Sequence, residues 1–424
     1  MNIAVVGTGP SAAAAVKTLV KSGYTVEVLD IGEVYSPGNN DKKLNSTLKS
    51  YFGSNFLYDS TLINKDNIIK NVFPSRSYGG YSLVWGATIN GERKNDIIDS
   101  QFNFKPNFYA LKNELKVHEN PHSLAVNQKL CNFCGECLKG CSKNAIWDSR
   151  VVFNELIDSN AIKYRRGKVV KLCQKEVVEL TTESGELLSY DRVLLCCGPI
   201  STINILYNSD IITSTVFLND SQTFFGFLVR FPKKLSKSEF ALSHKNITIY
   251  KDSSVHSIIQ LYLDARGLRF RYLPEKYANK SYVKFIFKVI SSVFVPFIGY
   301  LPEEKSGRLE VSSHKGSISL KSNFTLALRE KFSIFFRLFK SFIKIKMILI
   351  GFKFLGVGEG YHFGSIHGNN EADSIRLTSR VNNNSGILVF DACILNKVPN
   401  HLFTDEIISE IVVRINKYFP AVNS

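Results

Sequence analysis

Residues 2–12 read NIAVVGTGPSA, in which an apolar, mostly β-branched run leads into two glycines and a proline. The run predicts a buried strand over residues 3–6. The glycines predict a tight turn, and the alanine-rich segment after it predicts a helix to about residue 21. A second run of strand-forming residues begins at Tyr24 and ends at Asp30. Strand, helix and strand in this order predict a βαβ unit, and therefore an α/β fold built on a parallel sheet.

The turn between the first strand and the helix has the spacing G-x-G-x-x-A, which is typical of dinucleotide-binding sites. In such sites the first glycine permits the tight turn, the second lets the backbone approach a pyrophosphate, and the alanine lets helix and strand pack closely. The free N–H groups of the helix bind the anion, and an acidic residue about 20 positions further on binds ribose hydroxyls. The predicted cofactor-binding residues of this unit are Gly7, Gly9, Pro10, Ser11, Ala12 and Asp30. The spacing does not distinguish a nicotinamide from a flavin dinucleotide.

The length and composition are those of a globular protein. The chain has 424 residues, of which 44% are hydrophobic and 21% are charged. These values exclude a disordered or collagen-like protein, and they predict two or three domains or one large α/β body with an inserted module. No apolar run reaches the roughly 20 residues of a membrane-spanning helix. A strand that starts at Asn2 leaves no room for a signal peptide, so we expect a cytoplasmic protein.

The chain is strongly basic, with 53 basic and 37 acidic residues and a formal charge of +16. This balance predicts either attraction to a negatively charged partner or a solvated basic surface. No nucleic-acid-binding motif accompanies the charge, so we expect no nucleic-acid partner. Between residues 331 and 346, basic residues recur at helical intervals among Phe, Ile and Leu. This pattern predicts an amphipathic helix that either packs on the core or lies peripherally on an anionic membrane surface, at its inner face.

Four of the eight cysteines fall within eleven residues with the spacing C-x2-C-x2-C-x3-C, and they are Cys131, Cys134, Cys137 and Cys141. This is the spacing of the bacterial ferredoxin loop, whose thiolates bind an iron–sulfur cluster, although Ser142 replaces the proline that usually follows. We therefore predict a 4Fe-4S cluster. Zinc is the less favoured alternative, because four thiolates also suit a tetrahedral ion, and metal-free thiols are the third.

Four further segments resemble, in this order, the glucose–methanol–choline (GMC) family of flavin-dependent oxidoreductases. They read GGYSLVWGA from Gly79, VLLCCGP from Val193, YHFGS around His362 and NHLFT around His401, with Asp391 in the expected place before the last. The resemblance implies FAD, which we expect to be non-covalent because Val84 occupies the position through which some relatives attach it. It adds to the predicted cofactor-binding residues Gly79, Gly80, Ser82, Gly198 and Asp391, and it implies that His362 and His401 are catalytic.

The resemblance also implies a Rossmann-type FAD-binding domain, a sheet-based substrate domain and a small cysteine-rich insertion. The predicted FAD-binding domain comprises residues 1–119, 151–210 and 380–424. The ferredoxin-like cysteine module occupies residues 120–150. The substrate domain covers residues 211–379 and includes the predicted amphipathic helix.

The implied activity is that of a dehydrogenase, which oxidises an alcohol or sugar hydroxyl by hydride transfer to flavin N5. Histidine suits the accompanying proton transfer because its pKa lies near neutrality, and the sequence leaves open which histidine is the base. A 4Fe-4S cluster would pass electrons singly to an acceptor protein or a quinone, which favours a dehydrogenase over an oxidase. Two alternatives stay open. One is an FAD and iron–sulfur dependent reductase of a lipid-type double bond, and the other is a redox-sensing or scaffold protein.

Overall fold

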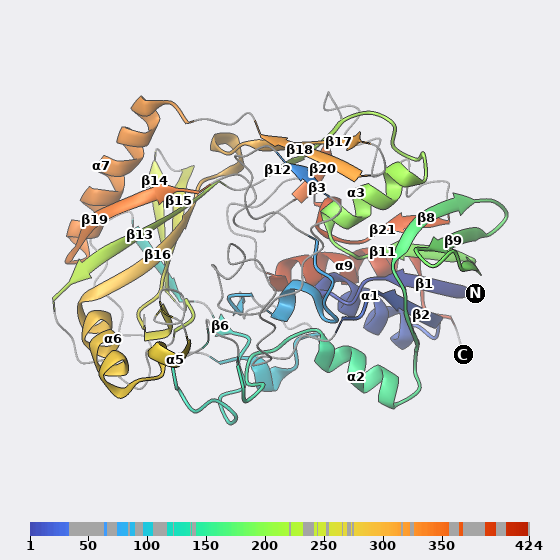
Figure 1. Cartoon of the computed structure of the whole chain (residues 1–424), viewed down its shortest axis with the longest axis horizontal. Coiled ribbons are helices and arrows are strands. Elements are labelled where there is room, and N and C mark those ends of the chain that lie inside the picture. Colours follow the sequence, from blue (N-terminus) through green and yellow to red (C-terminus); the bar gives the residue numbers. More distant parts are fainter. Residues whose placement is uncertain are drawn as a thin grey trace.

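The computed structural model describes residues 1–33, 63–65, 74–83, 85–89, 96–104, 117–121, 123–135, 137, 141–219, 222–231, 241–243, 245–251, 254–264, 266–268, 273, 275–314, 317–322, 326–355, 364–367, 386–395 and 404–422. Two bodies make up this part of the chain, and Figure 1 shows them on opposite sides of the view.

The first body is built on a five-stranded parallel sheet with the order β21-β11-β1-β2-β7. Its strands span Asn2–Val6 (β1), Thr25–Asp30 (β2), Lys163–Arg166 (β7), Arg192–Leu195 (β11) and Ile387–Val389 (β21). Because β1 is central, its apolar side chains are covered on both faces, and Ile3, Ala4 and Val5 are at most 1% exposed. The predicted α/β fold with a Rossmann-type domain is therefore confirmed.

Helices cover the parallel sheet, and in the described residues they are α1 (Pro10–Lys21), α2 (Arg150–Asp158), α3 (Pro199–Asn208) and α9 (Thr404–Tyr418). The predicted first helix is confirmed as α1, whose residues 12–15 are alanines without exposed surface, so that it packs closely. The C-terminal helix α9 packs against α1. The Tyr24 ring contacts the ring of Phe419, with centroids 5.6 Å apart, and its hydroxyl donates to the carbonyl of Pro420 (2.7 Å). These contacts hold the segment after α9 against the segment that follows α1.

Two smaller sheets extend the first body. One is antiparallel, has the order β10-β9-β8, and comprises Val169–Gln174 (β8), Val178–Thr182 (β9) and Leu187–Tyr190 (β10). The other pairs Thr88–Ile89 (β4) with Ser123–Leu124 (β6). Short 3-10 helices connect elements throughout the described chain at Gly80–Leu83 (η2), Ser100–Phe102 (η3), Arg266–Leu268 (η5), Glu303–Lys305 (η6) and Ala392–Ile394 (η7).

A mixed five-stranded sheet with the order β20-β12-β17-β18-β3 lies above the parallel sheet in Figure 1. Its strands are Ile63–Lys65 (β3), Val216–Asn219 (β12), Arg308–His314 (β17), Ser317–Ser322 (β18) and Gly364–His367 (β20). β17 and β18 form an antiparallel pair from Leu309–Ser322 to His314–Ser317. Buried Leu218, Leu309 and Val311 belong to the same hydrophobic core as β1, so this sheet is part of the first body.

The second body is an antiparallel six-stranded sheet with the order β19-β13-β16-β15-β14-β5. It comprises Val117–Pro121 (β5), Thr223–Arg230 (β13), Lys245–Lys251 (β14), Ser254–Leu261 (β15), Phe294–Tyr300 (β16) and Met347–Phe354 (β19), with the helices Glu275–Ala278 (α5), Ser281–Val293 (α6) and Leu328–Lys344 (α7). The predicted amphipathic helix is present as α7. It buries Leu338 and Phe342 in a second hydrophobic core together with Phe224 and Phe297.

Across the described elements, none of the helices has both the length and the apolar character required to traverse a bilayer.

Glycines make room for large rings in the second core. Gly299 on β16 pairs with Phe224 on β13, and a Cβ at Gly299 would lie 2.0 Å from the Phe224 ring. Phe224 has no exposed surface, so the ring cannot turn outward to relieve the clash.

Substitution Gly299→Ala is therefore expected to lower the free energy of unfolding by about 1–3 kcal/mol, the usual cost of overpacking a core. The matched control is Gly351→Ala on β19, because a Cβ there meets nothing within 4 Å. Urea denaturation of the three proteins measures the difference. Equal destabilisation by both substitutions would contradict the packing described here.

Candidate functional site

The first turn of the candidate site connects β1 to α1 at Gly7, which adopts φ +110°. A Cβ at this position would lie 2.7 Å from the carbonyl oxygen of Cys196 and 2.9 Å from the Cα of Cys197, so only glycine fits beside the end of β11. The helix then begins at Pro10, which has no N–H group that needs a partner. The N–H groups of the first turn of α1 stay free to bind an anion.

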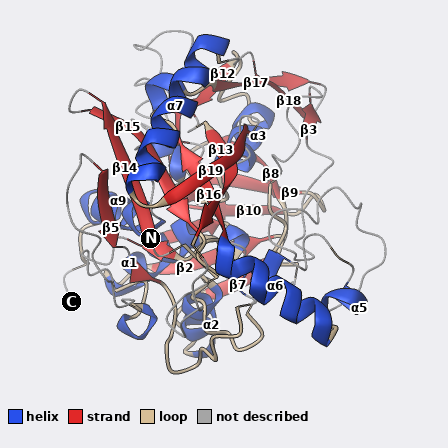
Figure 2. Ribbon diagram, turned by 90° about the vertical axis from the view of Figure 1, so that its left-hand side faces the viewer, coloured by secondary structure: helices blue, strands red, loops and turns tan. Residues whose placement is uncertain are grey.

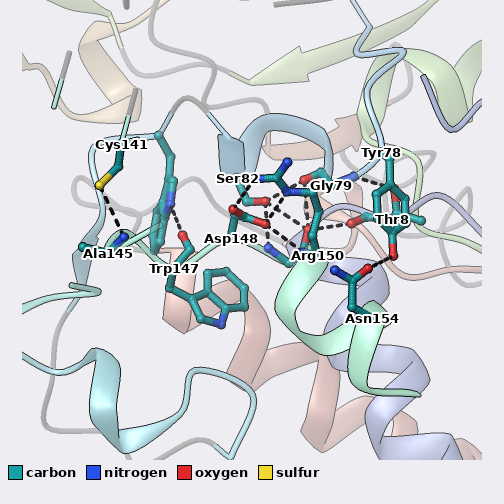
Figure 3. A network of polar contacts seen from close by, with 12 residues as sticks. Thr8, Tyr78, Gly79, Ser82, Cys141, Ala145, Trp147, Asp148, Arg150 and Asn154 are labelled. Carbon is teal, nitrogen blue, oxygen red and sulfur yellow. Dashed lines mark hydrogen bonds and ion pairs between the residues drawn. The ribbon is translucent and has the colours of Figure 1, made fainter. Parts of the chain in front are cut away.

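The second glycine-rich segment lies directly against the first, as Figure 3 shows for Gly79 and Thr8. The N–H of Gly79 donates to the hydroxyl of Thr8 (2.8 Å), which lies 71 positions away in the chain. A Cβ on Gly80 would approach the Cα of Gly9 to 3.1 Å. The two turns therefore form one surface made mostly of backbone, as the binding of a pyrophosphate and a flat ring requires.

Two buried serines hydrogen-bond to the backbone of both glycine turns and so hold the turns together. Ser149 Oγ donates to the carbonyl oxygen of Thr8 (2.6 Å) and lies 2.9 Å from that of Gly79. Ser82 Oγ donates to the same Gly79 carbonyl (2.6 Å) and accepts from the N–H of Ser149 (3.0 Å). The predicted cofactor residue Ser82 thus positions the second glycine segment, and the sequence analysis did not identify Ser149.

The predicted acid at the end of β2, Asp30, lies at the edge of the same surface. Its carboxylate accepts from the hydroxyl of Thr8 (2.5 Å) and from the N–H of Gly32 (2.7 Å). Burial raises the pKa of Asp30 to about 6, although both hydrogen bonds oppose this rise. Burial and the charge of Asp30 raise the pKa of the neighbouring Tyr78 to about 12. Ribose hydroxyls that donate to this carboxylate would favour its charged form.

A third glycine turn joins β11 to α3 at Gly198, which has φ +84° and precedes Pro199, the first residue of the helix. The buried carboxylate of Asp391 lies beneath this turn. It accepts from the hydroxyl of Thr202 (2.5 Å) and from the N–H of Cys393 (2.9 Å). Burial raises the pKa of Asp391. The hydrogen bonds from Thr202 of α3 and from Cys393 hold the chain after β21 against the first turn of α3.

These turns surround one cleft, which encloses about 1210 Å³ including its opening to solvent. Of the predicted cofactor residues, the cleft is lined by Gly7, Gly9, Pro10, Ser11, Asp30, Gly80 and Gly198. The other four do not line the cleft but support the residues that do, and they are Ala12, Gly79, Ser82 and Asp391. The sequence analysis missed several lining residues, among them Ser77, Tyr81, Lys168, Ser201 and Asn204.

Two of the missed residues have buried polar atoms that are not hydrogen-bonded to any described residue. Ser77 Oγ and Asn204 Oδ1 are buried, and within the described residues neither has a hydrogen-bond partner. Unpaired buried polar atoms are rare in folded proteins, and both of these line the cleft. A ligand with hydroxyl or amide groups would satisfy them, so the cleft fits a dinucleotide.

The four clustered cysteines line a second, smaller pocket together with Val126, Phe133 and Ala241. Backbone N–H groups point at the sulfurs: that of Phe133 lies 3.4 Å from Cys131 Sγ, and that of Ala145 lies 3.3 Å from Cys141 Sγ. Burial, followed by the proximity of the other three thiols, raises the pKa of Cys137. No set of three or more potential ligands in the described part of the chain has the geometry of a metal site. A metal that binds these thiols has to displace their protons.

The second body supports the cysteine pocket through an ion pair. Arg266 binds the buried carboxylate of Asp264 (2.7 Å), and both groups lie against the cysteine loop, where a Cβ on Gly135 would be 2.7 Å from Asp264 Oδ2. Gly135 has φ +73°, so it turns the chain where no side chain fits. The loop is thus held between the two bodies.

A short stretch of chain connects the cysteine pocket to the dinucleotide cleft. After Cys141, the chain passes through Trp147, whose carbonyl accepts from Trp85 Nε1 (2.8 Å) and whose ring meets that of Trp85 edge to face at 5.8 Å. Ser149 follows two residues later and reaches Thr8. One network of contacts therefore connects the cysteine loop with the first glycine turn (Figure 3).

The two predicted catalytic histidines, His362 and His401, and the predicted non-covalent position Val84 lie outside the described residues. The elements that follow the histidines are described. β20 begins at Gly364, pairs with β12 and lies against η7, and α9 begins at Thr404. The catalytic assignment stays a prediction.

Comparison with solved structures finds proteins that share the fold of this chain. Formate oxidase matches with a TM-score of 0.60 at 11% identity, over 99% of this chain and 98% of that chain. Formate oxidase from Aspergillus oryzae RIB40, studied for the effect of a mutation on FAD modification, matches with a TM-score of 0.57 at 10% identity and the same coverage. No protein-family model and no curated protein sequence matches this chain. The likeness extends over almost the whole chain and shows that the fold is shared.

In the cofactor-free protein, Asp30→Asn is expected to change the pH dependence of stability. A carboxyl group whose pKa rises on folding binds its proton more tightly in the native state. The wild-type protein should therefore gain about 1 kcal/mol in free energy of unfolding between about pH 7 and about pH 5, given a rise from 3.8 to about 6. The variant lacks this group and should not show the gain. Urea denaturation at both pH values tests this, and parallel behaviour of the two proteins would contradict it.

Proposed function

We propose that the protein is an FAD-dependent oxidoreductase of the GMC type, which oxidises an alcohol or sugar hydroxyl to a carbonyl. The observation that carries the proposal is the convergence of three glycine turns and Asp30 on one cleft that contains unpaired polar atoms. The fold shared with formate oxidase and the ordered motifs of the sequence support the same cofactor.

Each part of the cleft has a role toward the cofactor in this proposal. The N–H groups at the start of α1 bind the pyrophosphate, and Asp30 accepts hydrogen bonds from the ribose. The backbone of Gly80 lies against Gly9 and admits a flat ring system without steric conflict. When bound, FAD supplies the acceptor for a hydride from the carbon that bears the hydroxyl.

The proton of the substrate hydroxyl requires a base, and we assign this role jointly to His362 and His401. One imidazole accepts the proton, and the other donates a hydrogen bond to the same oxygen and so limits the build-up of charge. A histidine suits both roles because it gains and releases a proton near neutral pH.

Replacing each histidine by alanine tests the proposal directly. Each variant is expected to retain bound FAD, while kcat for substrate-driven reduction of the flavin falls on the order of 10²–10⁴-fold. The measurement is the loss of visible flavin absorbance in anaerobic mixing with a panel of alcohols, sugars and formate. Formate is included because formate oxidase shares the fold.

The control is His118→Ala, a histidine of β5 in the second body, which should leave flavin reduction unchanged. If no compound reduces the flavin, or if both catalytic-site variants turn over normally, the dehydrogenase is excluded. Full turnover with a reductant and a lipid-type double bond would then favour the reductase.

We propose further that Cys131, Cys134, Cys137 and Cys141 bind a 4Fe-4S cluster, with zinc as the alternative. Support comes from the shared pocket of the four thiols, from the N–H groups directed at two sulfurs, and from the hydrogen-bonded connection to the glycine turns. Such a cluster accepts electrons one at a time, so reduced flavin would be reoxidised by an acceptor protein or a quinone instead of oxygen.

Replacing Cys134 by serine is expected to abolish the iron and acid-labile sulfide of anaerobically prepared protein while FAD stays bound. The matched control is Cys173→Ser, because Cys173 is also exposed but lies on β8, outside the pocket. Metal analysis together with the optical spectrum gives the result. Zinc in place of iron would favour the zinc site over the cluster. Wild-type protein that contains neither iron nor zinc would contradict both proposals.

A further inference from the structure

Large apolar side chains are exposed mainly at one end of the second body. Among the described residues, thirteen of the twenty-one large apolar side chains that are exposed lie there. They are Phe231, Tyr277, Tyr282, Phe285, Ile286, Val289, Phe294, Leu328, Phe332, Phe336, Ile343, Ile348 and Ile350. We call this surface the apolar end. A concentration of this kind marks an interaction surface, because soluble proteins rarely expose large contiguous apolar patches.

The helix α6 turns its apolar stripe away from the protein. Tyr282, Phe285, Ile286 and Val289 are spaced by three and four residues, so they share one face, and they are 58%, 67%, 48% and 51% exposed. The buried residues of the helix include Val283, on a different side. A surface helix normally directs its apolar stripe at the core, so this stripe has no partner within the described chain.

The helix α7 also contributes exposed apolar residues to the apolar end. Ile334, Leu338 and Phe342 bury one side in the second core. Leu328 and Phe332, which are 73% and 60% exposed, extend the apolar stripe beyond the buried side. The helix therefore packs on the core, as one reading of its sequence pattern predicted, and it also exposes Phe332 and Phe336. Its predicted contact with a membrane stays a prediction.

Strand register places two of the remaining exposed residues on either side of β13, on the face of the sheet opposite the core that contacts α7. Val229 of β13 pairs with Phe294 on one side and with Ile348 on the other. Phe231, two residues further on, is 82% exposed. Figure 2 shows α7, β19, β13, β16 and α6 together on the side that faces the viewer. The elements that carry the exposed apolar residues thus lie on one side of the molecule.

Basic residues surround the apolar end. Residues 275–294 and 326–355 contain eleven basic and two acidic side chains. The basic ones are Lys276, Lys280, Lys284, Lys288, Arg329, Lys331, Arg337, Lys340, Lys344, Lys346 and Lys353, and all of them are exposed except Lys331 and Arg337, which are half-buried. Their long apolar stems can lie along a membrane surface while the charged ends reach phosphate groups.

We infer that the apolar end docks onto the surface of an anionic lipid bilayer, with α6 and α7 lying in the interface. A second copy of the chain fits this surface less well, because it would bring two sets of eleven cations together in a chain that already has a charge of +16. A bilayer accepts the exposed phenylalanines and isoleucines, and its anionic head groups neutralise the lysines. This inference concerns binding alone and does not depend on the proposed reaction.

Co-sedimentation of the FAD-containing protein with vesicles tests the inference. Binding is expected to vesicles that contain phosphatidylglycerol in phosphatidylcholine, to weaken with salt, and to be weak for phosphatidylcholine alone. The double variants Phe285→Ser with Phe332→Ser, and Lys340→Glu with Lys344→Glu, should each lower the binding constant about tenfold or more. The control Leu187→Ser removes a side chain that is equally exposed (67%) on β10 of the first body and should change nothing.

Insertion can be measured separately because the chain has only two tryptophans, Trp85 and Trp147, neither of them in the apolar end. Phe285→Trp should show a blue shift with anionic vesicles and quenching by brominated lipid chains. Retention of FAD by all variants shows that they are folded. The inference is overturned if the wild-type protein does not bind these vesicles. It is also overturned if the apolar end instead forms a dimer, detected by light scattering and abolished by the Phe285→Ser, Phe332→Ser pair.

Discussion

The hydroxyl of Thr8 joins the parts on which the candidate site depends. It donates to Asp30 at the end of β2 and accepts from the N–H of Gly79, and the Thr8 carbonyl accepts from Ser149. Segments that are distant in the chain thereby meet at one residue of the first turn. The carboxylate stays accessible to a ribose while the glycine backbones stay close enough to admit a flat cofactor. A hydrogen bond of this kind matters chiefly because its buried partners would be costly to leave unpaired.

The same network explains why the cysteine pocket lies beside the dinucleotide cleft. Ser149, which follows the cysteine loop in the chain, donates a hydrogen bond to Thr8 of the first glycine turn, and Trp147 packs on Trp85 of the second glycine segment. The second body completes the arrangement, because Asp264 and Arg266 hold the loop from the other side.

The second body has its own hydrophobic core, which leaves it free to carry a different surface. Its sheet is covered by α7 on one side, while α6 packs only lightly and turns its aromatic residues outward. The apolar end and the dinucleotide cleft therefore belong to different bodies. Contact with a partner at one does not obstruct the other, since the cleft is built from β1, β2, β11 and the helices that follow them.

The sequence by itself determined the βαβ unit, the cysteine loop and α7, because local periodicity and turn residues specify such elements. It also identified Gly7 and Gly9, since glycine spacing reflects backbone conformation directly. Only the tertiary structure revealed Ser149, Ser77 and Asn204, because their roles arise from contacts between segments far apart in the chain. It likewise decided that α6 exposes its apolar stripe. Sequence periodicity shows that a helix has an apolar side, but only packing determines whether that side meets the core or the solvent.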